Sequence, residues 1–159
     1  MGEDAVHILH GPVGSGKTTA LINRFPVNRG HGGILTPRID ELRYFLDLRT
    51  GERFRMEADK EESPVLEVGR FRFSLPGFEK ANQVIRESFT VPGWLVVDEI
   101  GPLELRGEGF HDSVKVLLNS HHPRLLLVVR EGLLEQVTHY FSIQNKVTIH
   151  ADQLDSLTG

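Results

Sequence analysis

The chain has 159 residues, of which 39% are hydrophobic and 25% are charged, and its formal net charge is −4. These values fit one globular domain, and the acidic balance argues against a general nucleic-acid-binding surface, which needs a basic patch. No apolar run reaches the ~20 residues of a membrane-spanning helix. The first residues include Glu3 and Asp4 rather than the basic start of a secretory leader, so we expect a cytoplasmic protein. The lack of cysteine excludes disulfides and thiolate metal sites.

The first predicted elements are a strand over residues 6–10, a glycine-rich loop, and a helix from residue 18 to about residue 24, ended by Pro26. The loop and the helix start form a complete G-x-x-x-x-G-K-T motif. In that position the backbone N–H groups bind phosphates, the lysine contacts the β- and γ-phosphates, and the hydroxyl binds Mg²⁺. The predicted nucleotide-binding loop comprises Gly11, Pro12, Val13, Gly14, Ser15, Gly16, Lys17, Thr18 and Thr19, with Thr18 as a metal ligand.

The middle of the chain predicts an antiparallel β insertion over about residues 30–75. Residues 28–33 are rich in glycine and predict a flexible connection. Residues 44–57 alternate apolar and charged side chains around a central turn, which is typical of a hairpin with one buried face. Residues 65–73 predict a second pair of short strands.

Beyond residue 76, helical and strand patterns alternate. Helices are predicted near residues 78–89, 110–118 and 133–141, and strands over residues 94–97, 125–129 and 146–149. The first two of these strands are wholly apolar, which is typical of a parallel sheet covered on both faces. The patterns predict a single α/β domain over residues 1–159, with a mostly parallel central sheet flanked by helices.

Two carboxylates, Asp98 and Glu99, follow the apolar strand at 94–97. Ligands of parallel α/β sheets bind at the carboxyl ends of the strands, so this pair should face the phosphate loop. Asp98 would then hold Mg²⁺ together with Thr18, and Glu99 would orient a water for attack on the γ-phosphate. The alternative is that two acidic residues only cap the following turn.

Residues 98–105, D-E-I-G-P-L-E-L, resemble the signature of a small P-loop nucleoside-triphosphatase family that includes thermophile enzymes and a human cancer-related member. Residues 33–37, 47–52 and 68–71 also resemble segments of that family, in the same order. The resemblance implies a RecA-like P-loop fold and broad hydrolysis of nucleoside triphosphates to diphosphates.

The same resemblance implies that the strand at 125–129 lies between the strands at 6–10 and 94–97. Arg130 would then point at the γ-phosphate and stabilise charge in the transition state, as an arginine finger does. The alternative for Arg130 is an ion pair with a neighbouring glutamate. Arg70 is a second candidate, and its alternative is an exposed arginine in a hairpin turn.

Together these observations predict a Mg²⁺-dependent nucleoside triphosphatase that hydrolyses ATP, GTP and other triphosphates to diphosphate and phosphate. Lys17, Glu99 and Arg130 are the predicted catalytic residues, and Thr18 and Asp98 the predicted metal ligands. Two alternatives stay open: a small P-loop kinase, and a nucleotide-dependent regulatory or delivery protein. A glutamate directly after the metal-binding aspartate favours water as the acceptor. We expect no nucleic-acid or membrane partner, while a protein partner stays open.

Overall fold

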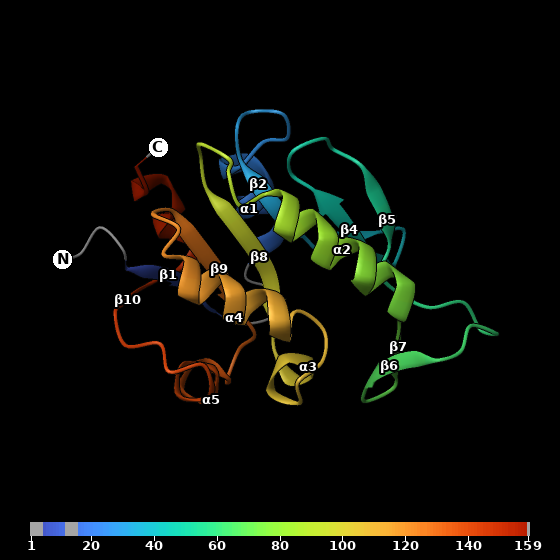
Figure 1. Cartoon of the computed structure of the whole chain (residues 1–159). Coiled ribbons are helices and arrows are strands. Elements are labelled where there is room, and N and C mark those ends of the chain that lie inside the picture. Colours follow the sequence, from blue (N-terminus) through green and yellow to red (C-terminus); the bar gives the residue numbers. More distant parts are fainter. Residues whose placement is uncertain (1–4, 12–15, 159) are drawn as a thin grey trace.

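The computed structural model describes residues 5–11 and 16–158. Over these residues, an eight-stranded sheet runs through the centre of the molecule (Figure 1). Five of its strands are parallel, in the spatial order β10 (Lys146–Ile149), β1 (Val6–Leu9), β9 (Leu125–Val129), β8 (Leu95–Ile100) and β2 (Gly32–Leu35). β9 therefore lies between β1 and β8, as the family resemblance implied.

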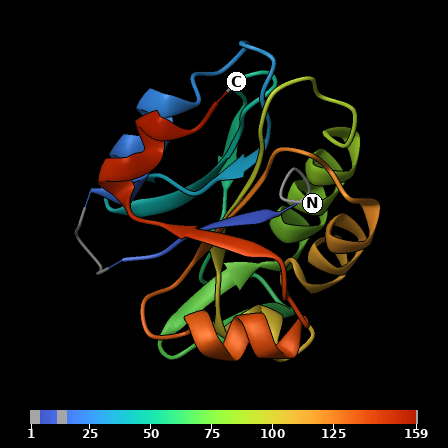
Figure 2. The same cartoon turned by 90° about the vertical axis from the view of Figure 1, so that its left-hand side faces the viewer.

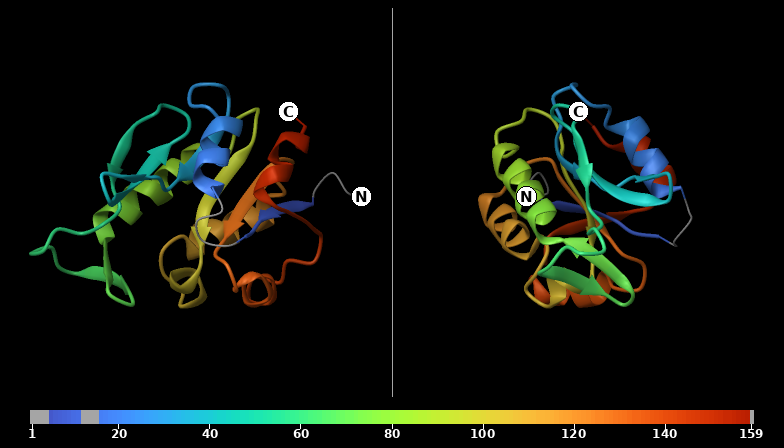
Figure 3. Two further views of the ribbon diagram at one scale, coloured as in Figure 1. Left: turned by 180° about the vertical axis from the view of Figure 1, so that it is seen from behind. Right: turned by 90° about the vertical axis from the view of Figure 1, so that its right-hand side faces the viewer.

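An antiparallel part extends the sheet beyond β2. β4 (Leu42–Asp47) pairs with β2, and the short strands β3 (Arg38–Ile39) and β5 (Arg53–Arg55) both pair with β4. β6 (Val65–Val68) and β7 (Phe71–Ser74) form a separate two-stranded sheet. Figure 3 shows this part at the end of the molecule opposite the two termini.

Helices cover both faces of the sheet (Figure 2). One face carries α1 (Lys17–Arg24) and the 3-10 helix η2 (Ala151–Ser156), and its core includes Leu21, Phe25 and Trp94. The other face carries α2 (Leu75–Glu87), α4 (His111–Ser120) and α5 (Leu134–Tyr140), with the short α3 (Pro102–Leu105) beside them. The predicted α/β fold, with a mostly parallel sheet flanked by helices, is confirmed. In the part of the chain that the structure describes, no helix has the length and apolar character needed to cross a membrane.

Two predicted boundaries are wrong. The insertion was expected to begin near residue 30, but residues 32–35 form β2, which is parallel to β8 and belongs to the central sheet. The glycines there serve close packing: a Cβ on Gly33 would overlap the carbonyl oxygen of Val96, and one on Gly32 would lie 2.7 Å from Cβ of Ser88. The strand expected to end at residue 97 continues through both carboxylates to Ile100.

Candidate active site

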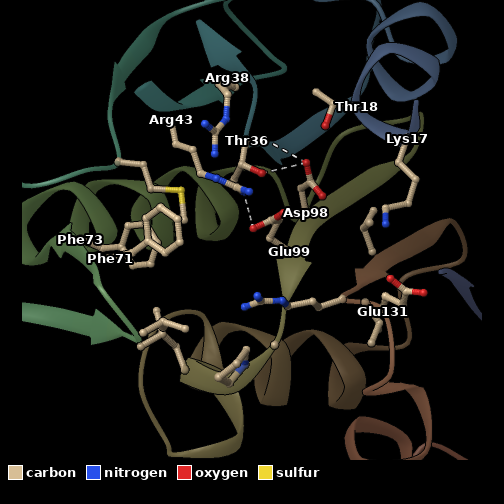
Figure 4. Close-up of a pocket in the computed structure, with 18 of the residues that line it drawn as sticks. Lys17, Thr18, Thr36, Arg38, Arg43, Phe71, Phe73, Asp98, Glu99 and Glu131 are labelled. Atoms are coloured by element: carbon tan, nitrogen blue, oxygen red, sulfur yellow. Dashed lines mark hydrogen bonds and ion pairs between the residues drawn. The ribbon is translucent and has the colours of Figure 1, made fainter. Parts of the chain in front are cut away.

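A cleft of about 480 Å³ opens at the carboxyl ends of the parallel strands, where α/β proteins bind ligands (Figure 4). Its walls come from the start of α1, the ends of β8 and β9, and the antiparallel part. The predicted site residues that line it are Gly16, Lys17, Thr18, Thr19, Asp98, Glu99 and Arg130. Pro12, Val13, Gly14 and Ser15 lie outside the described residues, so their predicted role in binding phosphate stays a prediction.

The start of α1 places the lysine of the phosphate loop. Gly16 has a φ of 81°, a left-handed conformation that favours glycine, and the helix begins at the next residue. The Nζ of Lys17 donates a hydrogen bond to the carbonyl oxygen of Gly11 at 2.7 Å, so the side chain reaches back across the loop. The N-terminus of α1 and the Lys17 ammonium thus bring positive charge to one side of the cleft.

Asp98 is buried at the centre of the cleft, with 3% of its surface exposed. Its Oδ2 accepts hydrogen bonds from the backbone N–H and the hydroxyl of Thr36, at 3.1 and 3.0 Å. Burial and the neighbouring charge of Glu99 raise the pKa of Asp98 to about 6. A bound divalent cation would favour the ionised carboxylate, because metal ligands must be deprotonated.

Glu99 adopts an unusual backbone conformation. Its φ is 65°, and the register of β8 against β9 shifts between Val97 and Ile100, which marks an irregularity of the bulge type. In a regular strand, consecutive side chains point to opposite faces. Here both Asp98 and Glu99 line the same cleft. The left-handed conformation costs a non-glycine residue about 1 kcal/mol or more, and strain of this kind is common at functional sites.

The carboxylate of Glu99 forms an ion pair with Arg43, with Oε2 and Nη1 2.5 Å apart (Figure 4). Arg43 belongs to β4, in the antiparallel part, and was not predicted from the sequence as a site residue. Arg38 also lines the cleft, and so do the apolar side chains of Met56, Phe71 and Phe73. Figure 4 shows Phe71 and Phe73 on one side of the cleft and Lys17 and Thr18 on the other.

The two predicted arginine-finger candidates differ in position. Arg130 follows β9 directly, lines the cleft, and donates its backbone N–H to the carbonyl oxygen of Ile100 at 2.9 Å. Arg70 is exposed in the β6–β7 turn, where its guanidinium lies over the ring of Phe71 at 5.5 Å, and it is not among the cleft-lining residues. Arg130 is therefore the better placed of the two.

The donors at the cleft fit a magnesium ion. Thr18 and Asp98 offer hydroxyl and carboxylate oxygens, which are hard donors of the kind that Mg²⁺ prefers. Within residues 5–11 and 16–158, no group of three or more histidine or carboxylate side chains is arranged to hold a metal by itself. This suits magnesium sites in which substrate phosphates and water complete the coordination.

The sequence model of the NTPase family matches residues 7–156. The chain belongs to the NTPase family. It is 30% identical over 130 residues to the nucleoside-triphosphatase THEP1 of Methanopyrus kandleri, covering 76% of this chain and 71% of the relative. The family resemblance and the enzyme class, a nucleoside-triphosphatase, are confirmed.

Two solved structures share the fold. THEP1 from the hyperthermophile Aquifex aeolicus superposes with a TM-score of 0.72 and 20% sequence identity, over 97% of this chain and 96% of that one. A human cancer-related nucleoside triphosphatase superposes with a TM-score of 0.68 and 22% identity, over 96% of this chain and 94% of that one. These likenesses support the α/β architecture around the cleft.

The D-E-I-G-P-L-E-L segment that first indicated the NTPase family also contains a structural carboxylate. Glu104 is buried, and its two oxygens accept hydrogen bonds from the backbone N–H groups of Gly101 at 2.7 Å and Phe110 at 2.8 Å. Burial raises the pKa of Glu104 to about 7. Glu104 thus holds together the turn that follows Glu99. Its spacing within the segment was a signal for such a role, although no role was predicted for it from the sequence.

Proposed function

We propose that this chain hydrolyses nucleoside triphosphates to diphosphate and phosphate in the described cleft, with Mg²⁺ as the metal. The observation that carries the proposal is that Asp98 and Glu99 both line the cleft beside the N-terminus of α1. Lys17 and the N–H groups at the helix start would bind the phosphates, and Thr18 and Asp98 would hold the metal. Mg²⁺ would neutralise charge that develops on the β- and γ-phosphate oxygens.

In the proposed reaction, Glu99 orients a water and accepts one of its protons. The water oxygen forms a bond to the γ-phosphorus, and the bond from that phosphorus to the bridging oxygen breaks, which leaves the diphosphate. Arg130 would contact the developing charge. The protein need not form a covalent intermediate, because phosphoryl transfer depends mainly on positioning and charge neutralisation.

The apolar side of the cleft favours a second candidate activity beside the nucleoside-triphosphatase class, phosphoryl transfer to an organic acceptor as in a small P-loop kinase. Met56, Phe73 and Phe78 are each more than nine-tenths buried and line the same cleft as Glu99. An attacking water does not need an apolar surface of this kind, whereas an organic acceptor would use it. The two candidates differ in whether each diphosphate formed is matched by one free phosphate.

The test measures diphosphate and phosphate released from a panel of nucleoside triphosphates with Mg²⁺. Wild type should release both in equal amounts. Glu99→Gln should still bind nucleotide but lose about 10²- to 10⁴-fold in turnover, and Lys17→Ala should lose binding as well. Glu79→Gln, at an exposed position on α2, serves as the matched control. Binding without phosphate release by wild type would overturn hydrolysis. Diphosphate formed without free phosphate, once an organic acceptor with a hydroxyl group is supplied, would favour the kinase.

The acidic net charge of −4 supports the absence of a nucleic-acid partner. From the same composition we infer a cytoplasmic location.

A further inference from the structure

Arg43 lines the cleft, and the proposed mechanism gives it no role. It comes from β4 in the antiparallel part, while the phosphate-loop lysine and the two carboxylates come from the parallel core. Its guanidinium contacts the carboxylate of Glu99 at 2.5 Å, and both side chains line the cleft. In the nucleotide-free protein, the Glu99 carboxylate, which should receive a proton from water, is therefore paired with the positively charged guanidinium of Arg43.

The backbone of Arg43 is fixed on both sides. Its N–H donates to Oε2 of Glu57 at 2.7 Å, and its carbonyl oxygen accepts from the N–H of Met56 at 3.1 Å. The side chain is 26% exposed and that of Glu99 is 38% exposed, so the pair borders the open cleft. A change of partner for the guanidinium would thus require only side-chain rotation.

The charge of a bound γ-phosphate would favour this change of partner for the guanidinium. Burial would lower the pKa of Arg43, but the carboxylates of Glu99, Asp98 and Glu57 outweigh burial and raise it, so the guanidinium keeps its charge. A bound γ-phosphate carries about two negative charges, against one on Glu99. It also presents oxygens that match the planar, two-pronged geometry of a guanidinium.

We propose that Arg43 is a catalytic residue that stabilises the transferring γ-phosphoryl group, and that the Arg43–Glu99 ion pair is the resting form of the site. This inference rests on the proposed role of Glu99. A triphosphate draws the guanidinium to its γ-phosphate and thereby frees the Glu99 carboxylate to accept a hydrogen bond from water. A diphosphate lacks that group and leaves the pair intact, so water is activated only when a γ-phosphate is present.

The first experiment compares Arg43→Ala and Arg43→Lys with Arg53→Ala, an exposed arginine on β5 of the same hairpin that does not line the cleft. Turnover, diphosphate affinity and melting temperature are measured for each. Arg43→Ala should lose about 100-fold or more in kcat while binding diphosphate within about twofold of wild type. Added guanidinium chloride at millimolar concentration should restore part of its activity. Arg53→Ala should behave as wild type.

A double-mutant cycle tests the resting pair itself. Affinity for a non-hydrolysable triphosphate analogue is measured for wild type, Arg43→Ala, Glu99→Gln and the double variant. Removal of Arg43 should weaken binding at least about fivefold more in the Glu99→Gln background than in the wild-type background. With Glu99 present, the guanidinium must first leave its ion pair, and this cost offsets part of what its contact with the γ-phosphate contributes to binding. If removal of Arg43 weakens binding of the analogue by the same factor in both backgrounds, the Arg43–Glu99 ion pair is not the resting form of the site.

The outcomes separate this inference from the proposed function. Hydrolysis by Arg43→Ala within threefold of wild type, or a loss without guanidinium rescue and with equal weakening of diphosphate binding, would overturn the role of Arg43. Hydrolysis that survives in Glu99→Gln would instead overturn the proposed role of Glu99. The Arg43→Lys variant keeps the positive charge but not the planar, two-pronged guanidinium, so its activity should lie between those of wild type and Arg43→Ala.

Discussion

The carboxylate of Glu104 is buried without an ion pair among the interactions described for it, and two backbone N–H groups hold it in place. Backbone hydrogen bonds favour its ionised form, while burial opposes that form and dominates, which raises its pKa from about 4.5 to about 7. The folded protein therefore binds the proton more tightly than the unfolded chain between these two values. By linkage, the contribution of Glu104 to stability falls as pH rises from about 4.5 to about 7.

Glu104→Gln should lower the free energy of unfolding by about 1–3 kcal/mol at pH 5, because the hydroxyl oxygen of the protonated carboxyl can still accept from the second N–H group, whereas an amide nitrogen cannot. The difference from wild type should shrink at pH 8, where the wild-type carboxylate is ionised and destabilised by burial. Thermal unfolding from pH 5 to pH 8 measures this, with Glu108→Gln at an exposed position as control. Asp98 is present in both wild type and the variant, so its contribution to the pH dependence cancels in the difference between their unfolding free energies. A difference that stays constant with pH would contradict the raised pKa.

Gly33 has a φ of 97° and packs against the backbone of Val96 in β8. A methyl group there would overlap a main-chain carbonyl that cannot move without breaking the pairing of β2 with β8. Gly33→Ala should therefore cost about 3 kcal/mol or more in denaturant unfolding. Gly69→Ala is the matched control, since Gly69 also has a positive φ, of 57°, but nothing lies within 4 Å of its Cβ position. Equal losses in the two variants would mean that strain, not the overlap, sets the cost.

At the scale of elements, the sequence predicted what local patterns encode. The phosphate loop and the Asp98–Glu99 pair are contiguous motifs, and the long helices and buried strands have clear apolar periodicity. Residues joined only by topology were missed: Thr36 binds Asp98 across 62 positions of the chain, and Arg43 reaches Glu99 from another strand. Short elements such as α3 and η2 have too few turns to show a periodic pattern of apolar residues. Gly32 and Gly33 suggested a loop because glycine occurs both in flexible segments and where close packing leaves no room for a side chain.

The pairing of α1 with η2 is one such long-range contact, and it supports the helix that carries Lys17. Arg24, the last residue of α1, donates to the carbonyl oxygens of Leu154 and Leu157, at 3.1 and 2.9 Å. The indole N–H of Trp94 donates to the carbonyl oxygen of Thr158 at 2.9 Å on the same face.

Arg24→Ala should destabilise the protein by about 1.5–3 kcal/mol, because it removes charge-assisted hydrogen bonds to η2. Denaturant unfolding followed by the fluorescence of Trp94, the single tryptophan, reports on this face directly. The exposed Arg29→Ala provides the control. If both variants unfold at the wild-type denaturant concentration, the contact between α1 and η2 contributes nothing to stability.

At the scale of the whole molecule, the cleft joins two parts of different architecture. The parallel core supplies Lys17, Thr18 and the carboxylates at the end of β8, and the antiparallel part supplies Arg43 and much of the apolar surface. A triphosphate in the cleft would contact both parts at once. Ligand binding should therefore stabilise the molecule as a unit rather than the core alone.

A non-hydrolysable triphosphate analogue with Mg²⁺, at about 100 times its dissociation constant, should add about 2.7 kcal/mol of stability. For a domain of this size that corresponds to a rise of about 5–10 °C in melting temperature. Chelation of Mg²⁺ with EDTA should remove most of the rise, because Asp98 would then face the phosphates as an uncompensated carboxylate. In Asp98→Asn, the melting temperatures with Mg²⁺ and with EDTA should differ much less than in wild type. Differential scanning calorimetry should show one transition that moves as a whole. Two transitions, of which only one responds to the analogue, would mean that the antiparallel part unfolds separately and that its contacts do not contribute to binding.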